Sequence, residues 1–151
     1  MSVSFRPFIP ADEPEIIKMC LSLYAEDTGA YTMTVEKINS TIQQWKDFPE
    51  KGNIIVFEVN KHLIGYANLI YYWSNEYGGN IIILDEIFVK KDYRNKGVTT
   101  RFIQEFHHIF DKPVAGYELQ VHTGNDNAMR LYQRLGFTKN PNTFMLKLKS
   151  L

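Results

Sequence analysis

Two adjacent acidic residues interrupt the most apolar stretch of the chain. Asp85 and Glu86 separate Ile81–Leu84 from Ile87–Val89, and the continuous apolar character of this run predicts a strand buried on both faces. A buried charge is costly unless it is paired. A carboxylate whose pKa is raised can instead act as a general base and remove a proton from an ammonium group, directly or through water.

Strand alternation limits how the two acids can be used. Successive side chains of a regular strand point to opposite faces, so only one of the two is expected to face a given cleft. Asp85 should then share a face with Ile87, and Glu86 with Leu84 and Phe88. Either acid is a candidate base and either can form a structural ion pair, because such pairs also perturb carboxylates. The sequence leaves this choice open.

A charged turn with one glycine follows the acidic strand. It runs from Lys90 to Gly97 and opens an amphipathic helix at Val98. Backbone N–H groups at a helix start are unpaired and lie at the positive end of the helix dipole, so they can hold a phosphate. Gly97 permits close approach of a ligand to the backbone, while Arg94 and Lys96 add positive charge.

A second group of candidate residues lies in the last predicted helix. Asn125 is a candidate N-cap, Ala128 is small, and Tyr132 lies on the same inward face. A tyrosine, with a pKa of about 10, can hydrogen-bond or protonate a departing thiolate, whose thiol has a pKa of about 8.5. The structural alternative for Tyr132 is a buried core side chain.

Together the two segments resemble the GNAT superfamily of acetyl-CoA-dependent N-acyltransferases. Phe88-Val89 followed by residues 94–99 is similar to the family's Arg/Gln-x-x-Gly-x-Gly/Ala motif after an aromatic–Val pair. Residues 125–137 match the family pattern Asn-x-x-Ala-x-x-Leu-Tyr-x-x-x-Gly-Phe at every fixed position. The chain departs from the family at Thr99, where Gly or Ala is usual, and at Asn95, where glycine is frequent.

The resemblance implies acetyl-CoA as co-substrate. No metal is expected, because the sequence has no second cluster of ligands at suitable spacing beside His107 and His108. The resemblance also implies that the strand before the turn pairs with the pantetheine arm as an added strand, and that amides of the turn surround the pyrophosphate. A backbone amide near the strand's end would polarise the thioester carbonyl. The implied cofactor-binding residues are Ile87, Phe88, Val89, Arg94, Asn95, Lys96, Gly97, Val98, Thr99, Thr100, Asn125 and Ala128.

The amine acceptor is the least determined part of the predicted site. In similar proteins it enters near the loop before the acidic strand and near the first two helices. This makes Glu76, Tyr77 and Tyr31, with Glu26 and Asp27, weak acceptor-binding candidates. Small amines and the amines of peptides both remain open. His122, at the end of a strand near the expected cleft, is an alternative base or a structural residue.

The elements that must position these residues follow the order β-α-α-β-β-β-α-β-α-β. Asp12 and Glu15 suggest a capping box for the first helix. The unit 81–121 predicts a right-handed parallel crossover. We therefore expect one α/β domain over residues 1–151 with the GNAT fold, a mixed six- to seven-stranded sheet flanked by about four helices. The expected strands are Val3–Phe8, Asn53–Val59, His62–Trp73, Ile81–Val89, Tyr117–Val121 and Thr143–Leu148, and the helices begin near Asp12, Thr34, Gly97 and Asn125.

Composition narrows the class of protein. The 17 basic and 17 acidic side chains cancel, so charge gives no argument for a nucleic-acid or membrane partner. The single cysteine excludes an internal disulfide, and with no apolar leader in the first residues we expect a cytoplasmic protein. Homodimerisation is common in the resembled family.

Three hypotheses follow for function. The first is a GNAT N-acetyltransferase that moves an acetyl group directly to a primary amine, with Asp85 or Glu86 as base and Tyr132 as acid. The second, motivated by Thr99, is a non-catalytic acyl-CoA-binding sensor or regulatory module. The third is an interaction domain that does not bind coenzyme A.

Overall fold

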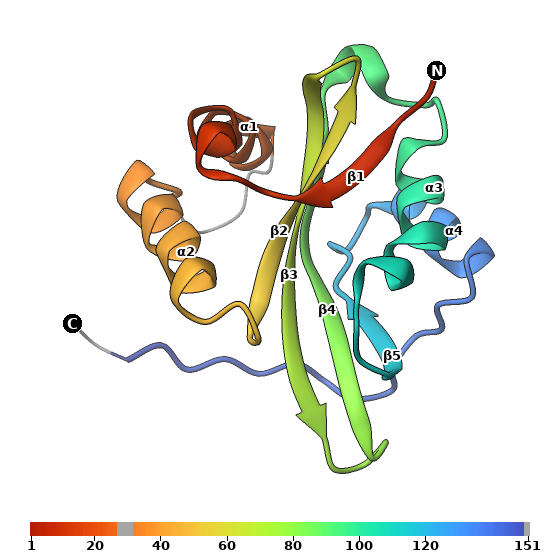
Figure 1. The fold of residues 1–151 in the computed structure, drawn as a ribbon. Helices are drawn as coiled ribbons and strands as arrows, with labels where there is room; N and C mark the ends of the chain where they lie inside the picture. Colours follow the sequence, from red (N-terminus) through yellow and green to blue (C-terminus); the bar gives the residue numbers. More distant parts are fainter. Residues whose placement is uncertain (27–31, 150–151) are drawn as a thin grey trace. The chain divides into compact units, whose positions relative to one another are not determined.

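The structure is a computed structural model that describes residues 1–26 and 32–149. The chain forms two compact units, Met1–Gln120 and Val121–Leu151, which are described separately. The first unit contains a five-stranded sheet and three α-helices (Figure 1). Its elements are β1 (Ser4–Pro7), α1 (Glu13–Glu26), α2 (Val35–Asp47), β2 (Gly52–Val59), β3 (His62–Ser74), β4 (Gly79–Val89), α3 (Val98–Glu105) and β5 (Val114–Leu119).

The sheet is mixed, as the sequence predicts. Its strands follow one another in chain order, and the pairs from β1 to β4 are antiparallel, whereas β4 and β5 are parallel. The β2–β3 hairpin turns at Asn60 and Lys61, whose φ angles of 49° and 65° are those of a tight hairpin turn. Helix α3 supplies the crossover between the two parallel strands.

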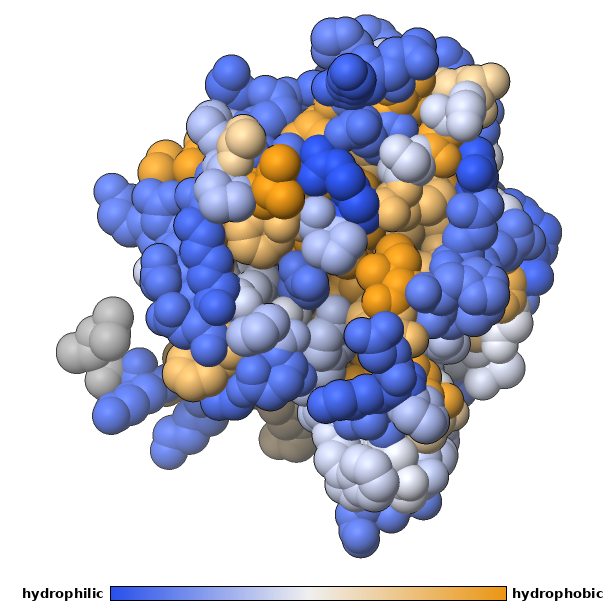
Figure 2. Space-filling model, in the orientation of Figure 1, coloured by the Kyte–Doolittle hydropathy of each residue, from blue (hydrophilic) through white to orange (hydrophobic). Residues whose placement is uncertain are grey.

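Two hydrophobic cores lie on opposite faces of this sheet. Helices α1 and α2 cover one face and α3 covers the other (Figure 1). Hydrophilic residues cover most of the side of the protein seen in Figure 2, as expected for amphipathic helices around a sheet. The α1/α2-side core includes Ile16, Met19, Ile38, Ile42, Val56, Tyr66 and Phe88. The α3-side core includes Ile55, Phe57, Leu69, Ile82, Leu84, Val98 and Phe102.

The second unit contains α4 (Asp126–Arg134). The side chain of Asn125 accepts a hydrogen bond from the Ala128 amide at 3.2 Å, so the predicted N-cap is confirmed. Gly136 has a φ of 94° just after the helix, where a C-terminal glycine is expected. The predicted single domain over the whole chain stays a prediction.

The predicted closing strand Thr143–Leu148 is wrong. This segment has no regular secondary structure among the described residues, and Phe144, Met145 and Leu146 are exposed. A run rich in apolar residues becomes a strand only when a neighbouring strand supplies hydrogen bonds, and the described residues of its own unit form no strand. The sheet therefore has five strands where six to seven were expected.

The predicted capping box of the first helix is also wrong. Asp12 accepts a hydrogen bond from the Ile9 amide at 2.9 Å and two from Arg6, at 2.7 and 3.1 Å. Arg6 also contacts Glu58 on β2, so the cluster ties β1, β2 and the start of α1 together. Burial alone would raise the pKa of Asp12, but its hydrogen bonds outweigh burial and the pKa is lowered.

We expect Asp12→Asn to destabilise the protein by about 1–3 kcal/mol at neutral pH, because the substitution removes one of the two carboxylates that pair with Arg6. Glu50→Gln, at an exposed acid without an ion pair to a described residue, should change little. Chemical denaturation of both variants measures the difference.

The pH dependence of this effect has a defined sign. A lowered folded-state pKa stabilises above the unfolded value of about 3.9, and this stabilisation is lost as the pH falls through the folded-state pKa. The difference between wild type and Asp12→Asn should therefore shrink on acidification. A difference that is constant down to acid pH would contradict the role of the Asp12 charge.

Candidate active site

A β-bulge in β4 determines where the two strand acids point. Asn68 on β3 is opposite Glu86 and Leu69 is opposite Leu84, so Asp85 is one extra residue without a partner on β3. In such a bulge two residues on one strand oppose one on the other, and strict alternation is interrupted.

The predicted faces of Asp85 and Glu86 are therefore wrong. Leu84 packs in the α3-side core, while Phe88 packs in the α1/α2-side core, although regular alternation would place both on one side with Glu86. Both carboxylates line the same cavity, which the expected geometry excluded. The extra residue at position 85 is the physical reason, because it changes the phase of the strand.

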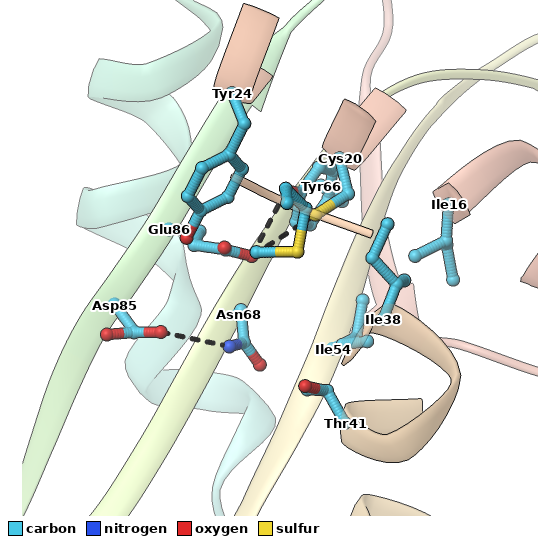
Figure 3. A pocket seen from close by; sticks show the side chains of 11 residues that line it. Ile16, Cys20, Tyr24, Ile38, Thr41, Ile54, Tyr66, Asn68, Asp85 and Glu86 are labelled. Atoms are coloured by element: carbon cyan, nitrogen blue, oxygen red, sulfur yellow. Dashed lines mark hydrogen bonds between the residues drawn. The ribbon is translucent and has the colours of Figure 1, made fainter. Parts of the chain in front are cut away.

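The cavity lies between β4 and the helices α1 and α2 and has a volume of about 230 Å³. Figure 3 shows the side chains of Asp85 and Glu86 directed into it from β4. Its walls combine aliphatic side chains with hydroxyl, amide and carboxylate groups. The lining residues are Ile16, Cys20, Tyr24, Met33, Ile38, Thr41, Ile54, Tyr66, Asn68, Asp85 and Glu86.

Glu86 is the more deeply placed of the two acids. The Tyr66 hydroxyl donates to its Oε1 at 3.1 Å, and Tyr24 donates to the same carboxylate. Burial raises the pKa of Glu86, the hydrogen bonds from Tyr24 and Tyr66 oppose the rise, and the nearby Asp85 charge adds to it. A carboxylate held in place, with a raised pKa and facing a cavity, is suited to accept a proton.

Asp85 has a different environment. It is exposed enough to be solvated, and its Oδ2 accepts a hydrogen bond from Asn68 Nδ2 at 3.2 Å (Figure 3). Burial raises the pKa of Asp85, and the hydrogen bond from Asn68 offsets part of this rise. Because solvent reaches Asp85, we assign it the weaker tendency to hold a proton.

Cys20 lies next to the acid pair, with Sγ 4.0 Å from Glu86 Oε1. Burial, reinforced by the Glu86 charge, raises the pKa of Cys20 to about 11. Since the thiolate is the nucleophilic form, this buried thiol is unsuited to carry an acyl group.

The turn after β4 presents a row of backbone donors. None of the amides of residues 95–100 donates a hydrogen bond to a described protein group. Asn95 and Gly97 have φ angles of 59° and 74°, and Gly97 is the N-cap of α3. Alternating left-handed residues of this kind form a concave group of N–H donors that binds anions. The predicted phosphate turn is thus present as a geometry.

The basic side chains of the turn are held by protein groups. Arg94 Nε donates to the Val89 carbonyl at 2.6 Å, and its guanidinium forms an ion pair with Glu26 at the end of α1, at 2.9 Å. Lys96 is exposed, with Nζ 5.7 Å from the ring centre of Tyr93. Arg94 therefore joins the turn to β4 and α1, and direct phosphate binding by Arg94 stays a prediction.

Strand β4 continues beyond its parallel partner. Pairing with β5 ends at Leu84 and Leu119, whereas β4 runs on to Val89. Along residues 85–89 no described strand occupies the edge that faces away from β3. An open strand edge accepts an extended ligand by main-chain hydrogen bonds. Pantetheine binding along this edge stays a prediction.

The motif residues of the second unit are described only within that unit. Tyr132 lies on α4, with its ring 5.9 Å from that of Phe137 in an edge-on contact. Asn125 and Ala128 form the N-terminal cap of the helix. Their roles toward a ligand, and that of Tyr132 as an acid, stay predictions.

Two of the acceptor candidates do not lie at the cavity. Glu76 and Tyr77 lie in the turn of the β3–β4 hairpin, where the Tyr77 amide donates to Ser74 Oγ at 3.2 Å. At about 3.3 Å per residue along β4, this turn is some 20 Å from Asp85. Asp27 and Tyr31 lie outside the described residues.

Sequence reasoning missed three side chains that hold the acids. Tyr24 follows the same helical stripe as Cys20, so its position was visible but not its contact with Glu86. Tyr66 is 1% exposed, and a tyrosine buried in a strand usually contributes to packing. Asn68 is 5% exposed and is the only amide side chain within an otherwise apolar strand. A lone buried amide of this kind is a signal that could have been used.

No group of three or more His, Cys, Asp or Glu side chains in the described part of the chain is arranged to hold a metal ion. Among the helices formed by the described residues, none combines the length and the apolar character needed to cross a membrane.

Comparison with known proteins adds independent evidence. The model of the acetyltransferase (GNAT) family matches residues 18–137. A thialysine N-epsilon-acetyltransferase of Sus scrofa is 32% identical over 75 residues, which are 49% of this chain and 44% of that protein. The chain thus matches less than half the length of this relative.

Solved structures show the same fold. A protein described as a possible acetyltransferase from Clostridium difficile 630 has a TM-score of 0.81 at 22% identity, covering 100% of this chain and 99% of that one. AAC(6')-Iy, in complex with a bisubstrate analogue, CoA-S-monomethyl-acetylneamine, has a TM-score of 0.78 at 13% identity, covering 99% and 100%.

Proposed function

Because the chain belongs to the acetyltransferase (GNAT) family, we propose that it transfers an acetyl group from acetyl-CoA directly to a primary amine. One observation carries the proposal. The free edge of β4 at residues 85–89 joins a cavity containing Asp85 and Glu86 to a turn whose amides donate to no described protein group. This single strand segment would thereby place a thioester between an anion site and a base.

The described residues fit coenzyme A. The amides of residues 95–100 would hold the pyrophosphate, since N–H donors at a helix start bind phosphate. The free edge of residues 85–89 would hold the pantetheine arm, and an amide near Val89 would donate to the carbonyl oxygen. When bound, acetyl-CoA supplies the activated carbonyl that the amine attacks.

We assign the general base to Glu86. An aliphatic amine is protonated at neutral pH, since its pKa is about 10.4, and cannot attack until it loses a proton. Glu86 accepts that proton, directly or through water, from within the cavity. Asp85, which is solvated and hydrogen-bonded by Asn68, is better placed to hold positive charge.

The proton balance requires an acid at the other end of the reaction. The new C–N bond forms as the C–S bond breaks, and the sulfur leaves with the electron pair of that bond. On the strength of the Asn125–Phe137 motif we assign the proton donated to that sulfur to the Tyr132 hydroxyl. In sum an ammonium and a thioester give an amide, a thiol and one proton.

Thiol release in the presence of acetyl-CoA and a panel of primary amines tests the function. Amine-dependent release with an acetylated product supports it. Coenzyme A binding measured by calorimetry, with no thiol release for any amine, would instead favour the acyl-CoA sensor that the Thr99 substitution suggested. Failure to bind at millimolar concentration would exclude both.

Gly97→Ala should weaken coenzyme A binding about tenfold. An added Cβ would meet nothing within 4 Å, so the effect does not come from a clash. It comes from the φ of 74°, which costs an L-residue about 1–2 kcal/mol and which alanine escapes by rotating the turn amides away from the ligand.

Gly78→Ala is the matched control for this prediction. Gly78 has a φ of 61° and equally open surroundings, but it lies in the β3–β4 turn. Both variants should lose similar stability, and only Gly97→Ala should change the dissociation constant measured by calorimetry. Equal coenzyme A affinity in the two variants would refute the phosphate turn.

A further inference from the structure

All the charged side chains among the described residues that line the cavity are acidic. Two of its lining residues are carboxylates, and none of the described lining residues is Lys, Arg or His. Nearby cations are paired elsewhere, Lys90 with Glu15 and Arg94 with Glu26. The described lining residues therefore supply no positive charge to the acid pair.

Asp85 is oriented by a hydrogen-bond chain that begins on α2. Trp45 Nε1 donates to Asn68 Oδ1 at 2.7 Å, and Asn68 Nδ2 donates to Asp85 Oδ2 at 3.2 Å. Indole is a donor only, so the Asn68 oxygen must face Trp45 and its amide nitrogen must face Asp85. Asn68 is buried, and this chain favours the ionised form of Asp85 because it donates to the carboxylate.

The two acids thus receive different support. Glu86 is surrounded by phenol hydroxyls and a buried thiol, while Asp85 receives an amide donor and has solvent access. One general base is sufficient for acyl transfer to one amine. The second carboxylate, fixed by its own hydrogen-bond chain, is left without a task in the reaction.

We propose that Asp85 binds a second ammonium group of the acceptor, so that the acceptor is a short aliphatic diamine. Trp45 and Asn68 are positioning residues for this contact. The proposal rests on the proposed function, because it takes Glu86 as the base for the reacting amine. It adds the substrate class, which the family membership does not specify.

Size and polarity agree with this class. A volume of about 230 Å³ lies below the roughly 300–1,000 Å³ typical of pockets for drug-sized ligands. Ile16, Ile38 and Ile54 give apolar walls for methylene groups. A free α-amino acid is disfavoured, because its carboxylate would face two carboxylates with no described cation in the lining.

The first experiment compares acceptors whose reacting amine is carried by the same four-carbon chain. Acetylation of 1,4-diaminobutane, 1-aminobutane and lysine is measured as kcat/KM with acetyl-CoA. The wild type should prefer the diamine over the monoamine at least about tenfold, the size expected for one charge-assisted hydrogen bond. Equal values for diamine and monoamine, or a preference for lysine, would overturn the proposal while leaving the proposed function intact.

The second experiment changes the hydrogen-bond chain. Asp85→Asn should reduce the diamine-to-monoamine ratio about tenfold or more, and Trp45→Phe should reduce it in the same direction by releasing the Asn68 amide. Asp47→Asn and Trp73→Phe, at an exposed acid and an exposed indole, should keep the wild-type ratio. A loss of folded protein lowers the rates with both acceptors equally, so it does not change the diamine-to-monoamine ratio.

Binding without reaction separates the two proposals. Calorimetric titration with 1,4-diaminobutane and with 1-aminobutane measures recognition in the absence of acetyl-CoA. If no amine is acetylated but the diamine binds with a dependence on Asp85, the proposed function fails and the recognition stands. If the diamine binds no better than the monoamine to wild type, the recognition is refuted.

Discussion

Glu86→Gln is expected to lower kcat/KM at neutral pH by about 10²–10⁴, the usual contribution of a positioned general base. The amide keeps the size of the carboxylate and can still accept hydrogen bonds from Tyr24 and Tyr66, so the cavity should persist. What the variant lacks is a group that accepts the ammonium proton.

The pH profile distinguishes loss of the base from loss of binding. The pKa of Glu86 is raised by burial, so the wild-type rate should fall as the pH drops through that raised value and the carboxylate becomes protonated. The variant should lack this limb, and its rate should rise with the free-amine fraction toward about pH 10. Glu50→Gln provides the control, and a Glu86→Gln enzyme with the wild-type rate and profile would exclude Glu86 as base.

The second large effect is expected for Tyr132→Phe, which should reduce kcat by about 10²-fold or more. The substitution removes one hydroxyl and keeps the ring that contacts Phe137, so the helix should be retained. Without a donor the sulfur departs as an unprotonated thiolate, which raises the barrier of C–S cleavage.

Coenzyme A affinity and the alkaline limb of the pH profile provide the check. The dissociation constant should stay close to that of wild type, while the fall in rate that accompanies loss of the tyrosine proton at high pH should disappear. Tyr117→Phe, on β5, is the matched control. An unchanged kcat for Tyr132→Phe at every pH would remove Tyr132 from the mechanism.

Local patterns predicted most of the first unit. Thr34 caps α2 as expected, with its side chain accepting from the Lys37 amide at 3.3 Å, and Asn125 caps α4. Each of these caps depends on a few neighbouring residues, so it can be predicted without knowledge of the fold. The same holds for the turn after β4, whose helix start and Gly97 are encoded within ten residues.

The features that sequence missed depend on residues far apart in the chain. Asp12 follows a capping pattern, but Arg6, held also by Glu58 on β2, takes its carboxylate. Strand 143–148 was predicted from composition, yet a strand exists only with a partner. That Asp85 and Glu86 line the same cavity can be deduced only from the register between β3 and β4. Regular strand alternation alone predicts that the two side chains lie on opposite faces.

The extra residue at position 85 separates this acid from the packing of β4. Without it Leu84 would be followed directly by Glu86, and regular alternation would keep Leu84 in the α3-side core and Phe88 in the α1/α2-side core. Deletion of Asp85 would therefore remove one carboxylate while leaving the other side chains of the strand on their present faces. Descendants of this chain can thus lose this acid by deletion as well as by point substitution, so a change of acceptor can accompany a change of strand length.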